Sequence, residues 1–302
     1  MKSLIDYIKE AEEKKVAIGH FNISDLTGLK AIFAASQEAS LALSGREAAK
    51  NLQLPIIIGV SEGEREFIGA RQAAALVKSL REEFNYPIFL NADHTHSLEK
   101  IKEAVEAGFD AVIFDGSKLI FGENVRKTKE AIDYVKDVNP NILVEGEVGY
   151  IGSGSTLLRK IPEGAVFQIE DLTRPDEAER FVIETGVDLF SPAVGNIHGM
   201  LANAPNPKLN IGRIKEIKEA VKIPLVLHGG SGITDEDFRA AIDAGISIIH
   251  INTEIRLAWR KGLEQGLKSN PEEITPYKLL QAPIQSVKEV VKARLALFNK
   301  ML

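Results

Sequence analysis

An acid and two histidines follow an apolar run at residues 89–97, "FLNADHTHS". His94 comes directly after Asp93, and His198 and His228 lie near the ends of two later apolar runs, "VDLFSPAVGN" and "IPLVLHGG". Three neutral imidazoles with an open fourth position are the ligands of a catalytic zinc or a similar divalent ion. A carboxylate beside such a site is suited to proton transfer. These residues therefore predict a metal site with an adjacent acid–base group.

All histidines of the chain lie at or just beyond the end of a predicted strand. They are His20, His94, His96, His198, His228 and His250. A single histidine in such a place is most simply a hydrogen-bonded core residue, but six in one layer favour a shared site. Alternation along a strand would point Asp93 and His94 to opposite faces. We therefore expect the strand to end at this pair, so that both side chains reach one cavity.

Three further carboxylates compete for roles in the same layer. Asp115 ends the fourth apolar run, and Glu145 and Glu147 lie two residues apart on the fifth, so they share a face of that strand. For this pair, a buried structural salt bridge and a role beside the metal are equal alternatives.

Eight short apolar runs must position these side chains. They span residues 16–22, 54–61, 86–93, 110–117, 141–149, 187–196, 223–230 and 246–252. Most are rich in Val, Ile and Leu without clean alternation, which is typical of strands buried on both faces of a parallel sheet. Helical segments such as 97–108 and 234–245 open with Ser or Thr and close on Gly, as capped helices do.

Eight strand-then-helix units without a linker predict an α/β fold, a (β/α)8 TIM barrel with residues 1–302 as a single domain. A doubly wound open sheet is the alternative, but no G-x-G-x-x-G follows the first strand. Residues 40–52 are too long for a simple connection and predict an insertion, and residues 286–298 predict a C-terminal helical extension. Pro192 lies inside the sixth predicted strand, where we expect a bulge or an early splay.

Composition excludes several classes of protein. The net charge of −6 and the lack of a basic cluster argue against nucleic-acid and anionic-membrane surfaces. The absence of cysteine excludes disulfides, zinc ribbons and a thiol nucleophile. Residues 1–15 predict an amphipathic helix rather than a signal peptide, and no apolar run approaches transmembrane length. We expect a cytoplasmic protein.

Two glycine-rich or polar turns predict a phosphate site. The first, "HGGSG" at 228–232, precedes a predicted helix, so its backbone N–H groups and Ser231 can hold an anion. The second, "HINTE" at 250–254, ends the eighth run. Loops seven and eight are where barrels of this kind commonly hold phosphate.

Four motifs, "NADH", "VGNIHG", "LVLHGGSG" and "INTE", occur in an order and spacing that resemble the class II, metal-dependent fructose-bisphosphate aldolases. The broader group includes the tagatose-bisphosphate enzymes, and the likeness runs from residue 19 to residue 298. The resemblance implies reversible aldol cleavage of a ketose 1,6-bisphosphate, with fructose 1,6-bisphosphate favoured, to dihydroxyacetone phosphate and glyceraldehyde 3-phosphate. Alternatives are a tagatose-bisphosphate aldolase, another metal-dependent lyase or isomerase acting on a phosphorylated sugar, and a non-enzymatic paralogue.

The resemblance also assigns residues. It makes His94, His198 and His228 the ligands of one catalytic zinc ion per chain, puts Glu147 near the metal, and makes Asp93 the acid–base at the substrate C4 hydroxyl. The implied substrate-binding positions are Asn22, Ser61, Gly199, Gly229, Gly230, Ser231, His250, Asn252, Thr253 and Arg256. Among them, Arg256 matches an arginine that meets the far phosphate in some members. A monovalent cation is a second candidate cofactor, and a homo-oligomer, dimer or tetramer, is expected.

One loop departs from the family. Its relatives carry a glutamate after the fifth strand that moves protons on the dihydroxyacetone phosphate side, whereas residues 149–160 read "GYIGSGSTLLRK", with Gly154 and Ser155 near the acidic positions. We expect this loop to close over substrate and His250 or Glu163 to replace the glutamate. A Schiff-base aldolase would need a desolvated lysine at a strand end, and none of the strand-end runs supplies one.

Overall fold

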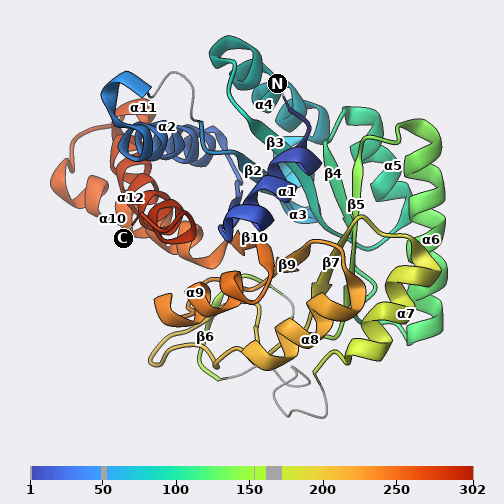
Figure 1. Cartoon of the computed structure of the whole chain (residues 1–302). Helices are drawn as coiled ribbons and strands as arrows, with labels where there is room; N and C mark the ends of the chain where they lie inside the picture. Colours follow the sequence, from blue (N-terminus) through green and yellow to red (C-terminus); the bar gives the residue numbers. More distant parts are fainter. Residues whose placement is uncertain (1, 49–52, 153, 161–171, 302) are drawn as a thin grey trace.

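Eight parallel strands form a closed barrel in the computed structural model, which describes residues 2–48, 53–152, 154–160 and 172–301 (Figure 1). The strands are β1 (Ile18–Asn22), β2 (Ile56–Val60), β3 (Ile88–Thr95), β4 (Ala111–Phe114), β5 (Leu143–Val148), β7 (Leu189–Pro192), β9 (Leu225–Leu227) and β10 (Ile246–Ile251). Their order around the barrel is β1-β10-β9-β7-β5-β4-β3-β2. The predicted barrel is confirmed, and each predicted apolar run coincides with one strand, although β3 extends two residues beyond its run.

Helices surround the barrel on the outside. They are α1 (Leu4–Lys14), α2 (Leu26–Ala48), α3 (Glu62–Ile68), α4 (Ala70–Phe84), α5 (Leu98–Ala107), α6 (Phe121–Val138), α7 (Pro175–Thr185), α8 (Ile211–Val221), α9 (Asp235–Asp243), α10 (Thr253–Ser269), α11 (Pro276–Leu279) and α12 (Gln281–Phe298). The expected capping is present, since Ser97 accepts a hydrogen bond at the start of α5 and Thr234 at the start of α9. Among the described helices, none is long and apolar enough to cross a bilayer.

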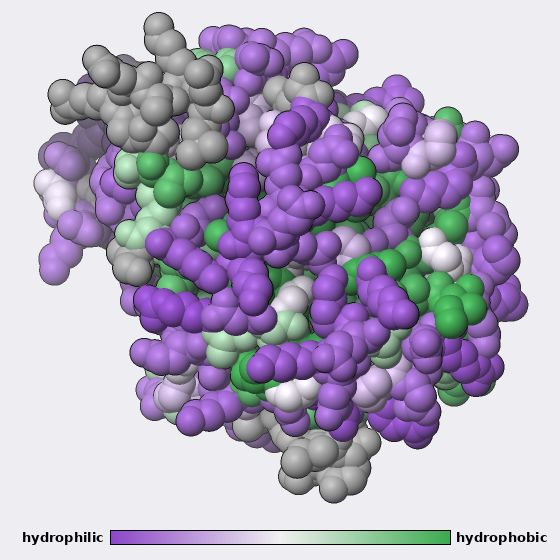
Figure 2. All heavy atoms as spheres, viewed as in Figure 1, coloured by the Kyte–Doolittle hydropathy of each residue, from purple (hydrophilic) through white to green (hydrophobic). Residues whose placement is uncertain are grey.

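Helix α1 closes the amino-terminal end of the barrel. Its apolar residues Leu4, Ile8 and Ala11 are buried against inward-facing side chains of the strands, such as Ile18 and Phe89. In Figure 1 the helix crosses the view in front of the strands, and Figure 2 shows this side as mainly hydrophilic with small hydrophobic patches. With this end filled by apolar side chains, a polar site belongs at the other end, the carboxyl ends of the strands.

The expected insertion lengthens α2. Helix α2 continues to Ala48, and beyond the insertion the backbone N–H of Leu54 donates a hydrogen bond of 3.0 Å to Ser40 Oγ. Residues 49–52 lie outside the described part of the chain. The C-terminal extension, α11 and α12, packs against α2 and α10 and buries Val287, Val291 and Leu295. Both predicted additions to the barrel are therefore present.

Of the two outcomes expected at Pro192, the bulge is absent and the strand ends early. The register between β5 and β7 runs without interruption from Glu145↔Leu189 to Val148↔Pro192. Pro192 is instead the last residue of β7, and Ala193 follows it with an N–H that donates to Thr173 Oγ1 at 2.8 Å. The proline therefore ends a short strand rather than distorting a longer one.

Candidate metal and substrate site

A β-bulge in β3 brings Asp93 and His94 to one cavity. Between β3 and β4 the register passes from Ala92↔Val112 to Thr95↔Phe114, so β3 contains one extra residue. His94 has a φ of 41°, in the left-handed region that non-glycine residues rarely adopt. The prediction that β3 ends at this pair is therefore wrong: the strand continues to Thr95, and the bulge turns the two side chains to the same side.

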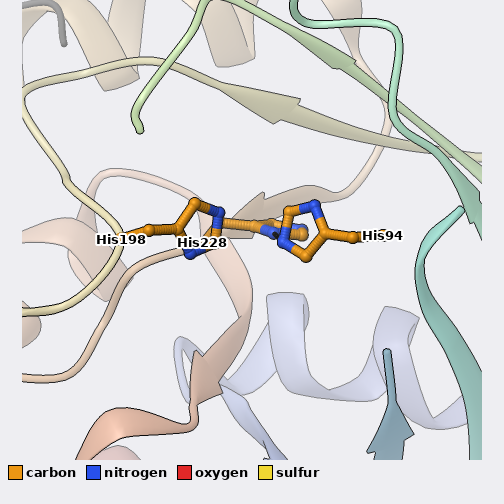
Figure 3. Close-up of side chains that lie close together, drawn as sticks. All are labelled: His94, His198 and His228. Atoms are coloured by element: carbon orange, nitrogen blue, oxygen red, sulfur yellow. Dashed lines mark hydrogen bonds between the residues drawn. The ribbon is translucent and has the colours of Figure 1, made fainter. Parts of the chain in front are cut away.

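Three histidines point toward one another at the carboxyl end of the barrel: His94 in β3, and His198 and His228 in the segments that follow β7 and β9 (Figure 3). Ring nitrogens of His94, His198 and His228 lie within 4.8 Å of one another. His94 Nε2 and His228 Nδ1 are 3.0 Å apart, near the roughly 3.3 Å that separates two nitrogen ligands of a tetrahedral zinc ion. The structure thus brings together the three predicted metal ligands.

In two of these imidazoles, the ring nitrogen that faces away from the cluster contacts a carboxylate. His94 Nδ1 lies 2.8 Å from Asp115 Oδ2, and His228 Nε2 lies 2.7 Å from Glu145 Oε1. Each carboxylate accepts a hydrogen bond from an N–H at these nitrogens, so His94 Nε2 and His228 Nδ1 are left facing each other. These two nitrogens can share a proton carried by His94, or both can coordinate a cation in its place, so the arrangement fits a metal ion.

The charges around the histidines indicate the same need for a cation. Burial and the neighbouring carboxylates raise the pKa of both Glu145 and Glu147 well above its usual range. Burial would lower the pKa of His94, but Asp93, Glu147 and Asp115 around it raise its pKa to about 10. Within the described part of the site, Glu147 Oε2 and Asp93 Oδ1 have no hydrogen-bond partner. Carboxyl groups are therefore crowded around the imidazoles, which favours a cation among them.

His20 and His250 stack on each other next to the three candidate ligands. They are paired in the β1–β10 register, and their rings lie 3.4 Å apart and nearly parallel. The ring of His20 lies against Gly59, where a Cβ would be 2.1 Å from His20 Cε1, so this position of β2 needs glycine. The ring of His250 also stacks on His228, at 4.0 Å. His250 Nδ1 is 3.3 Å from Asp93 Oδ1. The stacked imidazoles therefore place a ring nitrogen of His250 beside the carboxylate of Asp93.

A cavity opens above these groups and contains most of the predicted substrate residues. Those that line it are Asn22, Ser61, Asp93, His94, His198, Gly199, Gly229, Ser231, His250, Asn252, Thr253 and Arg256. Among the predicted residues, Gly230, Glu147 and His228 lie behind this lining. Gly230 still shapes the wall, because its N–H donates to the His250 carbonyl at 3.1 Å.

The predicted phosphate position lies at the start of α10. Ser231 Oγ accepts hydrogen bonds from the N–H groups of Asn252, at 3.3 Å, and Glu254, at 3.2 Å. These bonds link the turn after β9 to this helix. Gly229 has a φ of 63°, and a Cβ there would lie 2.2 Å from the Ile197 carbonyl oxygen, so only glycine fits the turn. A helix N-terminus beside a glycine-rich turn attracts an anion.

The loop that follows β5 covers part of the cavity. Its described residues Tyr150, Gly152, Gly154 and Ser155 contribute to the lining. A small parallel sheet of β6 (Leu157–Leu158) and β8 (Met200–Leu201) fixes its far end beside the residues that follow His198. The predicted closure of this loop stays a prediction, and the candidate Glu163 lies outside the described residues.

Two groups that the sequence analysis missed also belong to this site. Lys118 lines the cavity with its Nζ 5.5 Å from the ring of Tyr150, but its side chain is exposed and so lacks the desolvation that activates a Schiff-base lysine. Asn206 accepts from Leu201 N and donates to the carbonyl groups of Gly199 and Ser231, at 2.9 and 2.8 Å. Neither residue is part of a motif that stands out in the sequence.

Arg65 is a third missed group, and it holds the bulge in place. This buried side chain donates to the carbonyl oxygens of Val60, at 2.6 Å, and Asp93, at 3.2 Å, and to Thr95 Oγ1 at 3.0 Å. It therefore spans the ends of β2 and β3 on both sides of His94. A buried arginine with three acceptors was not recognisable from sequence, because its contacts depend on the register of two strands.

Replacing Arg65 should destabilise the protein. We expect Arg65→Met to lower the free energy of unfolding by about 2–4 kcal/mol, because three buried acceptors lose their donor. Arg71→Met is the matched control, since Arg71 is exposed on α4 and should change stability by less than about 0.5 kcal/mol. Thermal or urea unfolding measures both. Equal stability of the two variants would contradict a role for Arg65 in holding the bulge.

Known proteins are similar to this chain in both sequence and fold. The family described as fructose-bisphosphate aldolase class-II matches residues 2–301. A fructose-bisphosphate aldolase from Geobacillus stearothermophilus and one from Staphylococcus aureus (strain Mu50) are each 33% identical over 300 residues, covering 98% of this chain and 96% of the relative. Among solved structures, the YdjI aldolase from Escherichia coli K12 is 30% identical, covers 99% of this chain and 97% of its own, and has a TM-score of 0.79. Because the match spans nearly the whole chain, this protein belongs to the class II fructose-bisphosphate aldolase family.

Proposed function

We propose that this protein catalyses the reversible, zinc-dependent aldol cleavage of a ketose 1,6-bisphosphate to dihydroxyacetone phosphate and glyceraldehyde 3-phosphate. Fructose 1,6-bisphosphate is the favoured substrate. The observation that carries the proposal is the cluster of ring nitrogens of His94, His198 and His228, which lie within 4.8 Å of one another next to the cavity that Asp93 lines. Membership of the class II aldolase family supports the same reaction.

The donor set fits the cofactor on which the family in general depends, which is zinc. We assign one ion per chain to His94, His198 and His228, with Glu147 close behind them. When bound, zinc supplies a Lewis acid that stabilises negative charge on the substrate oxygens. Asp115 and Glu145 hold the rings of His94 and His228 in the orientation that this requires.

Asp93 is assigned to the proton of the C4 hydroxyl. Its Oδ2 accepts a hydrogen bond from Asn22 Nδ2 at 2.8 Å, which leaves Oδ1 for the substrate. As the C3–C4 bond breaks, Asp93 takes this proton, the C4 carbon becomes the aldehyde, and the electron pair of the bond passes to the enediolate. Burial alone would raise the pKa of Asp93, but His94 and His250 beside it hold the pKa well below its usual value, so the carboxylate is ready to accept.

The remaining proton belongs to the C3 carbon of the enediolate. His250 lines the cavity and is in contact with Asp93, so among the described residues it is the candidate for this transfer. The phosphate of the dihydroxyacetone half is assigned to Gly229, Ser231, Asn252 and Thr253 at the start of α10.

Several features stay predictions under this proposal. They are a single domain over residues 1–302, a monovalent cation beside the substrate, a homo-oligomeric assembly and a cytoplasmic location. Tagatose 1,6-bisphosphate is the alternative substrate, and an isomerase or another lyase acting on a phosphorylated sugar is the alternative reaction.

The proposal is tested by assay of the purified, zinc-loaded protein with fructose and tagatose 1,6-bisphosphates. We expect release of dihydroxyacetone phosphate, and we expect borohydride added with substrate to leave the protein active and without added mass. A substrate-dependent mass increase on a lysine, with Lys118 in the cavity as the first candidate, would refute the metal mechanism. If the protein cleaves neither sugar, the proposed function itself is refuted.

A further inference from the structure

The arginine that the family resemblance assigns to the far phosphate already forms an ion pair within the protein. Arg256, in the first turn of α10, lines the cavity. Its Nη2 donates to Glu64 Oε1 at 2.7 Å, and its Nη1 donates to the Ser155 carbonyl at 3.1 Å. Both terminal nitrogens of the guanidinium group therefore already have acceptors supplied by the protein.

Glu64 is fixed opposite Arg256. It lies in the first turn of α3, and its side chain is 5% exposed. Its Oε2 accepts hydrogen bonds from Asn22 Nδ2, at 3.0 Å, and from the N–H of Ser61, at 2.8 Å. If the carboxylate turned away from Arg256, these two donors, one buried and one partly buried, would lose this acceptor. The carboxylate therefore stays in place while substrate occupies the cavity.

This arrangement changes the electrostatics of the outer end of the cavity. A phosphate approaching Arg256 meets a guanidinium group that Glu64 already neutralises, and it also meets the charge of that carboxylate. An uncharged hydroxyl at the same place meets no such repulsion. At the inner end, Glu254 also lies close, but it is paired with Arg294 through two hydrogen bonds of 2.8 Å, so it adds little net charge there.

We propose that Glu64 is a specificity-determining residue that lowers the selectivity of this cavity for a second phosphate. The substrate class then extends to ketose 1-phosphates, whose far end is an uncharged hydroxyl. This inference rests on the proposed aldol cleavage at the same site. It concerns the end of the sugar that leaves as the aldehyde and does not alter the roles of Asp93 or the metal ligands.

The test compares fructose 1,6-bisphosphate with fructose 1-phosphate as substrates of the wild-type and Glu64→Gln proteins. The wild-type kcat/KM values for the two sugars should lie within about tenfold of each other, and Glu64→Gln should raise the ratio in favour of the bisphosphate about tenfold or more. The change should fall mainly on KM for the bisphosphate. Glutamine keeps the shape and one carbonyl oxygen for Asn22 and Ser61, and it replaces the charged oxygen that accepts from Arg256 with an uncharged NH2 group.

Two controls locate the effect. Glu66→Gln makes the same charge change on the same helix, but the side chain is 67% exposed, so the ratio should stay at the wild-type value. Glu64→Gln combined with Arg256→Gln should also return the ratio to near the wild-type value, because the gain acts through the freed guanidinium group. An unchanged ratio in Glu64→Gln, an equal shift in Glu66→Gln, or a shift that persists without Arg256 would each overturn the proposal.

Calorimetric binding separates this inference from the proposed function. If the zinc-loaded protein cleaves neither sugar, the proposed function fails. The Kd values of the two sugars then decide the role of Glu64: a bisphosphate that binds about tenfold tighter to Glu64→Gln, relative to the monophosphate, upholds it. An unchanged Kd ratio overturns it.

Discussion

Removal of the metal should abolish cleavage without unfolding the protein. We expect excess EDTA to lower the rate of ketose bisphosphate cleavage about a hundredfold or more, and added zinc to restore it. The far-UV circular dichroism should not change, because the barrel is held by an apolar core of strand and helix residues that includes none of the candidate ligands. Full activity in excess EDTA would contradict the metal assignment.

A single ligand variant should reproduce this loss. His228 is fully buried, with one ring nitrogen on Glu145 and the other facing His94, so His228→Ala should remove both the metal and the activity. Metal analysis of the wild type should give one zinc ion per chain. His96→Asn is the control for metal content, since the His96 side chain is 53% exposed and bonds the Asp115 carbonyl instead. Wild-type zinc content in His228→Ala would contradict the ligand set.

The barrel was predictable because its strands are buried on both faces. Runs such as 54–61 and 246–252 carry branched apolar residues without alternation, and these became β2 and β10. The convergence of His94, His198 and His228 was predictable for a related reason, since in a barrel the strand ends converge whatever their distance in sequence. A histidine at the end of a strand can therefore be recognised as a candidate metal ligand from the local sequence alone.

The rest depended on contacts between strands that no local pattern records. The bulge at Asp93 and His94 requires the register of β3 against β4 and the side chain of Arg65, which comes from α3. The ion pair of Glu64 with Arg256 joins residues 192 positions apart in the sequence. Charged residues at such positions are usually solvated, so neither Arg65 nor Glu64 stood out from the sequence.

Asp93→Asn should separate proton transfer from metal binding. Asparagine keeps the shape of the side chain, and its carbonyl oxygen can still accept from Asn22 Nδ2, as Asp93 Oδ2 does at 2.8 Å. It cannot take the proton of the C4 hydroxyl, so cleavage should fall about a hundredfold or more while zinc stays bound. Asp133→Asn is the matched control, because Asp133 is 64% exposed on α6, and it should retain the wild-type rate.

Proton exchange makes the assignment of Asp93 sharper. If Asp93 serves only the C4 hydroxyl, Asp93→Asn should still exchange the C3 proton of dihydroxyacetone phosphate with deuterated solvent, because another group handles that carbon. A matching loss of exchange and cleavage would mean that Asp93 serves both protons. Loss of zinc would instead make Asp93 a ligand, a role open to it because Asp93, His20 and His250 also offer three donor atoms within 4.8 Å. Retained zinc and retained exchange with lost cleavage is the one outcome that places Asp93 at the C3–C4 bond, where the cavity, the bulge and the hydrogen bond from Asn22 together hold it.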